Sequence, residues 1–178
     1  MFDSLLTALD DRRAEFLEGL DSVPPAQRDR TPSTHAWSPL QIGEHLVLVE
    51  HGLARIMARQ IEKGEERKQI GEPSEKSVEG LIRALRTPAK MKVPENVGVD
   101  PSGEMTMEAL RTQWRDTGAR WHEMANTLPP ELADEALVMH AVGGPLTFSQ
   151  TLRFLEAHIE HHLFQLARTV RALNTTPA

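Results

Sequence analysis

The sequence predicts an all-α protein, a four-helix bundle with a long crossover between its second and third helices. Three observations support this class. Four long segments repeat their apolar residues at helical spacing, turn-forming residues separate them, and no run of comparable length alternates apolar with polar residues. Because 178 residues suffice to bury one core, we expect a single domain over residues 1–178.

The first two helices have clear boundary signals. The first is predicted over residues 3–20, and Val23-Pro24-Pro25 follows its end. The second begins after Ser38-Pro39, an N-cap residue with proline at the first helical position, and runs to about residue 64. Six apolar residues at helical spacing are expected to form its buried face: Ile42, Leu46, Val49, Leu53, Ile56 and Met57.

Residues 64–102 are rich in Lys, Glu, Gly and Pro, so we expect a long connection with one short helix over residues 77–86. This connection is predicted to cross between the two halves of the bundle.

The third long helix is predicted over residues 103–127, with Trp114 and Trp121 in the core. A loop containing Gly143-Gly144-Pro145 comes later, and Thr147 is expected to cap the last helix, which continues to about residue 173.

The composition excludes several classes of function. A formal net charge of −6, with basic residues scattered among acidic ones, argues against a nucleic-acid partner. The absence of cysteine excludes disulfides, thiolate metal sites and a cysteine nucleophile. No apolar stretch approaches the ~18 residues of a membrane span, and the N-terminus is predicted to be an amphipathic helix rather than a signal peptide. We therefore expect a cytoplasmic protein.

Histidines of the last predicted helix have the spacing of metal ligands. His158 and His162 are four residues apart, so their Cβ atoms lie roughly 5–6 Å apart and both rings can reach one ion. His158 and His161, three apart, could chelate in the same way. On a helical wheel, His162 lies within about 60° of the centre of the apolar stripe, His158 about 90° away and His161 well outside it. This placement favours His158 and His162.

His45 is the natural third ligand, because it lies at the margin of the buried stripe of the second helix, whereas His51 lies on the polar face. Three imidazoles from two facing helices would bind a divalent ion such as zinc, nickel or iron(II) and leave coordination positions open, as in catalytic sites. Such an ion can lower the pKa of bound water or thiol. The alternative is a packed, hydrogen-bonded histidine pair without metal.

Other titratable residues are expected to have no part in the chemistry. Four histidines are predicted on the surface or in loops: His35, His51, His122 and His140. Four glutamates of the histidine-bearing helices are predicted to lie off the inward stripes: Glu44, Glu50, Glu156 and Glu160. No carboxylate general base is identified, and the catalytic residues stay unassigned.

Two motifs resemble the DinB-like family, also called the YfiT-like metal-dependent hydrolases. Residues 37–46, WSPLQIGEHL, are similar to the family's tryptophan, short spacer and His-Leu at the start of the second helix. Residues 144–147, GPLT, followed by HIEHHLFQL at 158–166, are similar to its glycine turn, HxxxH and glutamine. Helix order, crossover and length agree as well, so the resemblance covers nearly the whole chain.

The resemblance implies a bundle in which His45, His158 and His162 bind a divalent metal. His161 matches an extra histidine that is not a ligand in the family's usual pattern. Similar members are often homodimers, and characterised ones include transferases and isomerases that use a low-molecular-weight thiol such as bacillithiol or mycothiol.

Three functional hypotheses follow. The first is a metal-dependent enzyme, a thiol S-transferase or hydrolase acting on a small-molecule substrate. The second is a non-catalytic bundle, a metal-binding or stress-response interaction protein, and a solvent-open cavity beside the histidines would count against it. The third is an interaction module without metal, in which the histidines pack.

Overall fold

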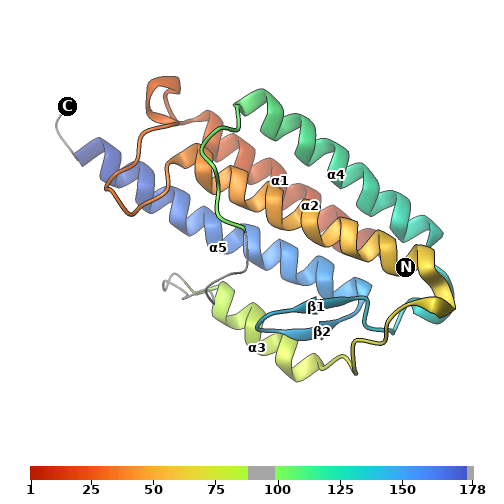
Figure 1. Ribbon diagram of the computed structural model, residues 1–178. Coiled ribbons are helices and arrows are strands. Elements are labelled where there is room, and N and C mark those ends of the chain that lie inside the picture. Colours follow the sequence, from red (N-terminus) through yellow and green to blue (C-terminus); the bar gives the residue numbers. More distant parts are fainter. Residues whose placement is uncertain (88–98, 176–178) are drawn as a thin grey trace.

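The main body of the protein is a bundle of four long helices (Figure 1). The structure, a computed structural model, describes residues 1–87 and 99–175. The bundle helices are α1 (Asp3–Asp21), α2 (Pro39–Lys63), α4 (Met107–Thr127) and α5 (Phe148–Thr175). α1 packs mainly on α5, while α2 packs on both α4 and α5. The predicted all-α bundle is confirmed, with each long helix within a few residues of its expected bounds.

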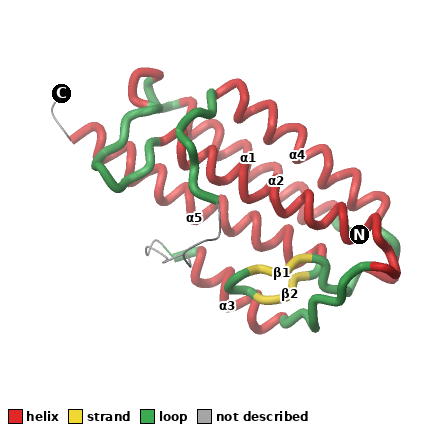
Figure 2. Tube along the Cα trace, in the orientation of Figure 1, coloured by secondary structure: helices red, strands yellow, loops and turns green. Residues whose placement is uncertain are grey.

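A short helix and a hairpin cover one side of α5 (Figure 2). The helix is α3 (Glu75–Leu85), which confirms the short helix expected in the crossover. Residues 88–98 of that crossover lie outside the described residues. Short 3₁₀ helices span Pro25–Gln27, Gly64–Glu66 and Pro130–Leu132.

The loop predicted around Gly143-Gly144-Pro145 is instead the turn and second strand of a hairpin. β1 (Val138–His140) pairs antiparallel with β2 (Gly144–Leu146), and Gly144 has a φ of +73°, a conformation open to glycine. Each strand has three residues, which is too short for an alternating pattern to stand out in the sequence.

Both predicted N-caps are confirmed, and each is a reciprocal capping box. At α2, the Gln41 N–H donates to Ser38 Oγ (3.1 Å) and the Ser38 N–H donates to Gln41 Oε1 (2.9 Å). At α5, the Gln150 N–H donates to Thr147 Oγ1 (3.2 Å) and the Thr147 N–H to Gln150 Oε1 (3.0 Å). These caps fix the starting points of the two helices that carry the candidate ligands.

The core includes Trp114 and Trp121, as expected, but the buried face of α2 differs from the predicted stripe. Ile56 is 45% exposed, whereas Glu44, Val47 and Glu50 are buried. The reason is that α2 is packed by both α4 and α5, so its buried arc is wide and includes polar side chains that find partners there.

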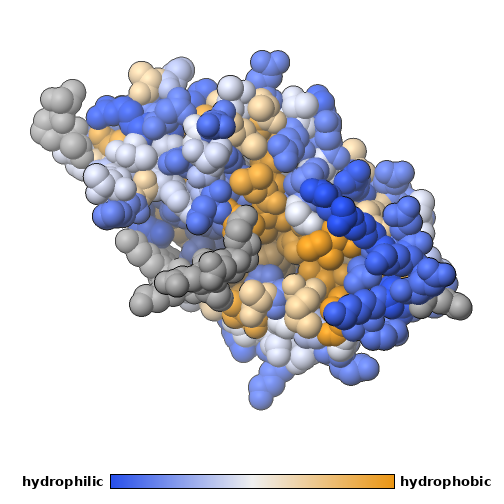
Figure 3. All heavy atoms as spheres, viewed as in Figure 1, coloured by the Kyte–Doolittle hydropathy of each residue, from blue (hydrophilic) through white to orange (hydrophobic). Residues whose placement is uncertain are grey.

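The visible surface is largely polar, with apolar residues gathered in the middle of the face shown in Figure 3. Within the described ranges, no helix combines the length and apolar character needed to cross a membrane.

Candidate metal centre

The candidate centre lies where α2 passes α5, two helices that pack on each other (Figure 1). His45 is in the second turn of α2, and His158 and His162 are one turn apart on α5. All three side chains are buried, with 5%, 9% and 7% of their surface exposed. The structure therefore brings together the three residues that the sequence selected.

The three rings converge through their Nε2 atoms. His158 Nε2 lies 3.1 Å from His162 Nε2 and 3.3 Å from His45 Nε2. The ligand atoms of all three histidines lie within 4.8 Å of one another. Tetrahedral coordination with Zn–N bonds of ~2.0–2.1 Å separates ligand nitrogens by roughly 3.3 Å. Two of the separations thus match a tetrahedral site, and the residues fit a divalent ion.

Hydrogen bonds at the outer nitrogens fix two of the rings. The His45 Nδ1–H donates to the carbonyl oxygen of Val99 (2.8 Å), which can only accept. The His162 Nδ1–H donates to Gln165 Oε1 (2.7 Å). A proton on Nδ1 leaves the lone pair on Nε2 in a neutral ring, so both rings present an acceptor to the centre.

Burial keeps these rings in the neutral state that binds metals. Burial lowers the pKa of His162 to about 3, with the neighbouring His45 adding to the effect. Burial and the charges of the other histidines hold the pKa of His158 well below its usual value. The pKa of His45 is also lowered by burial, which the Val99 carbonyl and the charge of Asp100 partly oppose. Near neutral pH all three imidazoles are uncharged.

A family model described as the DinB superfamily matches residues 8–166, most of the described bundle. The chain belongs to the DinB superfamily. Among curated proteins no match was found. The crystal structure of TT2238, a four-helix bundle protein, is similar over 99% of this chain and 100% of that one, with 19% identity and a TM-score of 0.51. At that identity the likeness supports the fold alone.

Aromatic rings surround the histidines of this DinB-superfamily chain. Trp37, half-buried just before α2, lies 4.8 Å from the His45 ring and stacks at 6.3 Å on that of His162. Phe154 stacks on His158 at 5.4 Å. Such rings lower the local dielectric and strengthen electrostatic interactions at the centre.

His161, which the helical wheel places outside the apolar stripe of the last helix, points to a neighbouring helix. Its Nδ1–H donates to the carbonyl oxygen of Leu85 (2.9 Å), in the last turn of α3, and the side chain is 8% exposed. The bond satisfies a carbonyl that has no partner within its own helix. His161 contacts the ring of His162 but is outside the convergent set of three.

The prediction that Glu44 and Glu50 lie off the inward stripes is wrong. Glu50 is 1% exposed and accepts hydrogen bonds from Arg13 Nη2 (2.6 Å) and Trp114 Nε1 (2.5 Å). Glu44 is 3% exposed and accepts from the loop before α4. Both carboxylates are buried because partners distant in the sequence neutralise or hydrogen-bond them, which the pattern of α2 alone could not indicate.

The other two glutamates lie nearer the surface, as predicted. Glu156 and Glu160 form ion pairs with Arg86 (2.7 and 3.0 Å), and their side chains are 14% and 25% exposed. Glu156 also pairs with Arg12 of α1 (3.1 Å).

Among the described residues, the remaining histidines are not part of the convergent set of three. His35 and His122 are exposed, and His122 pairs with Asp10 (2.8 Å). His140 is not in a loop, since it ends β1 half-buried, with its ring 4.4 Å from that of Phe154.

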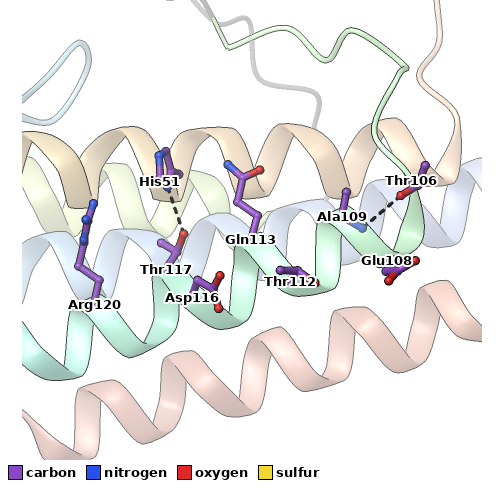
Figure 4. Close-up of a pocket in the computed structure, with 9 residues that line it drawn as sticks. All are labelled: His51, Thr106, Glu108, Ala109, Thr112, Gln113, Asp116, Thr117 and Arg120. Carbon is purple, nitrogen blue, oxygen red and sulfur yellow. Dashed lines mark hydrogen bonds between the residues drawn. The ribbon is translucent and has the colours of Figure 1, made fainter.

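His51 lines an open groove of about 660 Å³ along α4, and its ring points to Thr117 Oγ1 (3.3 Å; Figure 4). The groove contains none of the three convergent histidines. Nine residues line it: His51, Thr106, Glu108, Ala109, Thr112, Gln113, Asp116, Thr117 and Arg120.

Proposed function

We propose that this chain binds one divalent ion, zinc, nickel or iron(II), through His45, His158 and His162 and acts as a metal-dependent enzyme. The reaction is thiol S-transfer or hydrolysis of a small molecule. The observation that carries the proposal is the convergence of three Nε2 atoms, two of them on rings whose Nδ1–H is already hydrogen-bonded. Fixed outer nitrogens are the usual support of metal-binding histidines.

The donor set suits the proposed chemistry. Three neutral imidazoles match the ligand preference of these metals and leave coordination open. A bound divalent ion would supply Lewis acidity, lowering the pKa of a thiol or water in the open position. The chain contributes orientation of the rings and an aromatic wall at Trp37 and Phe154.

The alternative is a non-catalytic metal-binding or stress-response interaction bundle, and one observation favours it. The two buried glutamates of α2 are already committed: Glu44 to Ser102 and Gly103, Glu50 to Arg13 and Trp114. Neither is free to act as a general base. The low-molecular-weight thiol and the homodimer expected from the family resemblance stay predictions.

Two model reactions test the enzyme. In the first, a thiol (cysteine, bacillithiol or mycothiol) reacts with an aryl chloride, so that a carbon–sulfur bond forms and chloride leaves. In the second, water cleaves a nitrophenyl ester. Each is measured with metal-loaded wild type, with chelator-treated protein and with His158→Ala, while His35→Ala, an exposed histidine, is the matched control.

The proposal expects turnover in one reaction that is lost on chelation and in His158→Ala and kept in His35→Ala. Equal turnover by the metal-free protein would sink it. If the protein binds one equivalent of metal but turns over neither substrate, the non-catalytic alternative is favoured.

A further inference from the structure

Two successive residues of α2 hold the segment 99–103, which leads into α4. His45 holds its first residue, through the hydrogen bond from Nδ1–H to the Val99 carbonyl (2.8 Å). Glu44 holds its end: Oε1 accepts from the Ser102 N–H (2.9 Å) and from Ser102 Oγ (2.7 Å), and Oε2 accepts from the Gly103 N–H (2.9 Å). The segment is thus attached on both sides of Asp100.

The Glu44 attachment has the features of a strong one. The side chain is 3% exposed, both carboxylate oxygens are used, and three donors converge on them. Hydrogen bonds to an ionised acceptor are shorter and stronger than those between neutral groups. Gly103 takes a φ of +79°, which lets its N–H and that of Ser102 face the same carboxylate.

The position of the Val99 carbonyl decides which nitrogen of His45 carries the proton. A ring whose Nδ1–H donates to a carbonyl has its lone pair on Nε2, the atom that faces His158. A ring that lost this acceptor could carry its proton on Nε2, which would block that atom as a ligand. Because Val99 lies three residues before Ser102, whatever fixes Ser102 and Gly103 limits where its carbonyl can lie.

We infer that Glu44 is a positioning residue of the metal centre. Glu44 holds segment 99–103 against α2, so that the Val99 carbonyl keeps the proton of His45 on Nδ1. The role of Glu44 in metal binding rests on the proposed metal site. The effect on the His45 tautomer, however, exists in the metal-free protein and can be measured there.

The test compares Glu44→Gln with Glu104→Gln, which removes the same charge from an exposed residue beside the segment. In Glu44→Gln only the amide oxygen can accept a hydrogen bond. The NH₂ group would face a backbone N–H, so at least one of the backbone hydrogen bonds is lost. Ser102→Ala is the milder variant, which removes one of the three donors and leaves both backbone bonds. Long-range ¹⁵N–¹H NMR of the labelled, metal-free proteins reports the His45 tautomer, and competition with a chromophoric chelator reports zinc affinity.

We expect wild type and Glu104→Gln to hold the His45 proton on Nδ1. Glu44→Gln should show a tautomer mixture and bind zinc roughly 10–100-fold more weakly, the usual loss when a support of a ligand is removed. Ser102→Ala should change both readouts in the same direction by less.

A Glu44→Gln protein that unfolds more easily but keeps the wild-type tautomer would overturn the inference, because a merely structural role predicts that result. If wild type binds no zinc, the proposed function fails, and the tautomer readout still decides the role of Glu44. Normal zinc binding in wild type and Glu44→Gln alike would overturn the role of Glu44 and leave the site itself standing.

Discussion

His158 Nε2 lies 3.1 Å from His162 Nε2, and His162 has no proton to offer at that atom because its Nδ1–H donates to Gln165. His45 meets His158 in the same way at 3.3 Å. In the metal-free protein, therefore, one proton on His158 Nε2 serves two acceptors. A cation at this point would bind all three nitrogens together, which supports the proposed metal site.

The free energy of unfolding of the metal-free protein should fall as the pH is lowered from about 6.5 towards 3. Burial lowers the pKa of His162 to about 3, so in this window the unfolded chain, with a pKa near 6.5, binds the extra proton. For His162 alone, the loss between pH 7 and pH 5 should be about 2 kcal/mol. Urea unfolding at the two pH values measures it.

The control for this pH dependence is a pair of variants. His162→Gln removes the buried titrating group and should reduce the pH dependence by that amount, whereas His35→Gln, at an exposed site, should leave it unchanged. An unchanged dependence in His162→Gln would show that His162 titrates normally in the folded protein.

Arg13→Met should lower the free energy of unfolding by about 3–5 kcal/mol, because it leaves the 1%-exposed Glu50 carboxylate without its cation. Arg13→Met/Glu50→Met removes both charges and should recover at least about 1 kcal/mol of this loss. Arg115→Met, which breaks an exposed pair with Asp116, should change stability by less than about 0.5 kcal/mol. Chemical denaturation gives all three values, and a double variant less stable than Arg13→Met would refute this account of the pair.

Two glycines of α2 should respond in opposite ways to alanine. A Cβ at Gly43 would lie 2.6 Å from Leu110 Cδ1 and 3.4 Å from Phe16 Cε1, both in the core, so Gly43→Ala should cost about 1–3 kcal/mol. A Cβ at Gly52 would meet nothing within 4 Å, so Gly52→Ala should stabilise the helix by about 0.5–1 kcal/mol. Thermal unfolding compares them, and a stabilising Gly43→Ala would mean that Leu110 moves aside freely.

The helices and the histidine set could be predicted because their signals are local. Ser38 and Thr147 cap their helices through residues three positions later, and four-residue spacing alone places His158 beside His162. The position of each histidine relative to the apolar stripe of its helix then indicates which rings face the core. This criterion identifies His45 as well as His158 and His162.

What could not be predicted depends on partners far along the chain. Glu50 is buried because Arg13, 37 residues earlier, and Trp114, 64 residues later, reach it. Glu44 is buried because Ser102, 58 residues on, bonds to it. A helical wheel shows the residues of one helix and none of its distant partners. Without those partners, a charged residue is predicted to lie on the surface. Likewise His161, 76 residues after Leu85, hydrogen-bonds to that residue of α3, which packs on α5.

Metal content is the most direct test of the central claim. Untagged wild type, incubated with zinc, nickel or iron(II) and then desalted, is analysed by inductively coupled plasma mass spectrometry beside His45→Ala, His158→Ala, His162→Ala and the exposed control His35→Ala. The three-histidine centre predicts near one equivalent of one metal in wild type and in His35→Ala, and its loss in each of the other variants. A wild type that binds no metal, or a folded His158→Ala that retains a full equivalent, would contradict it.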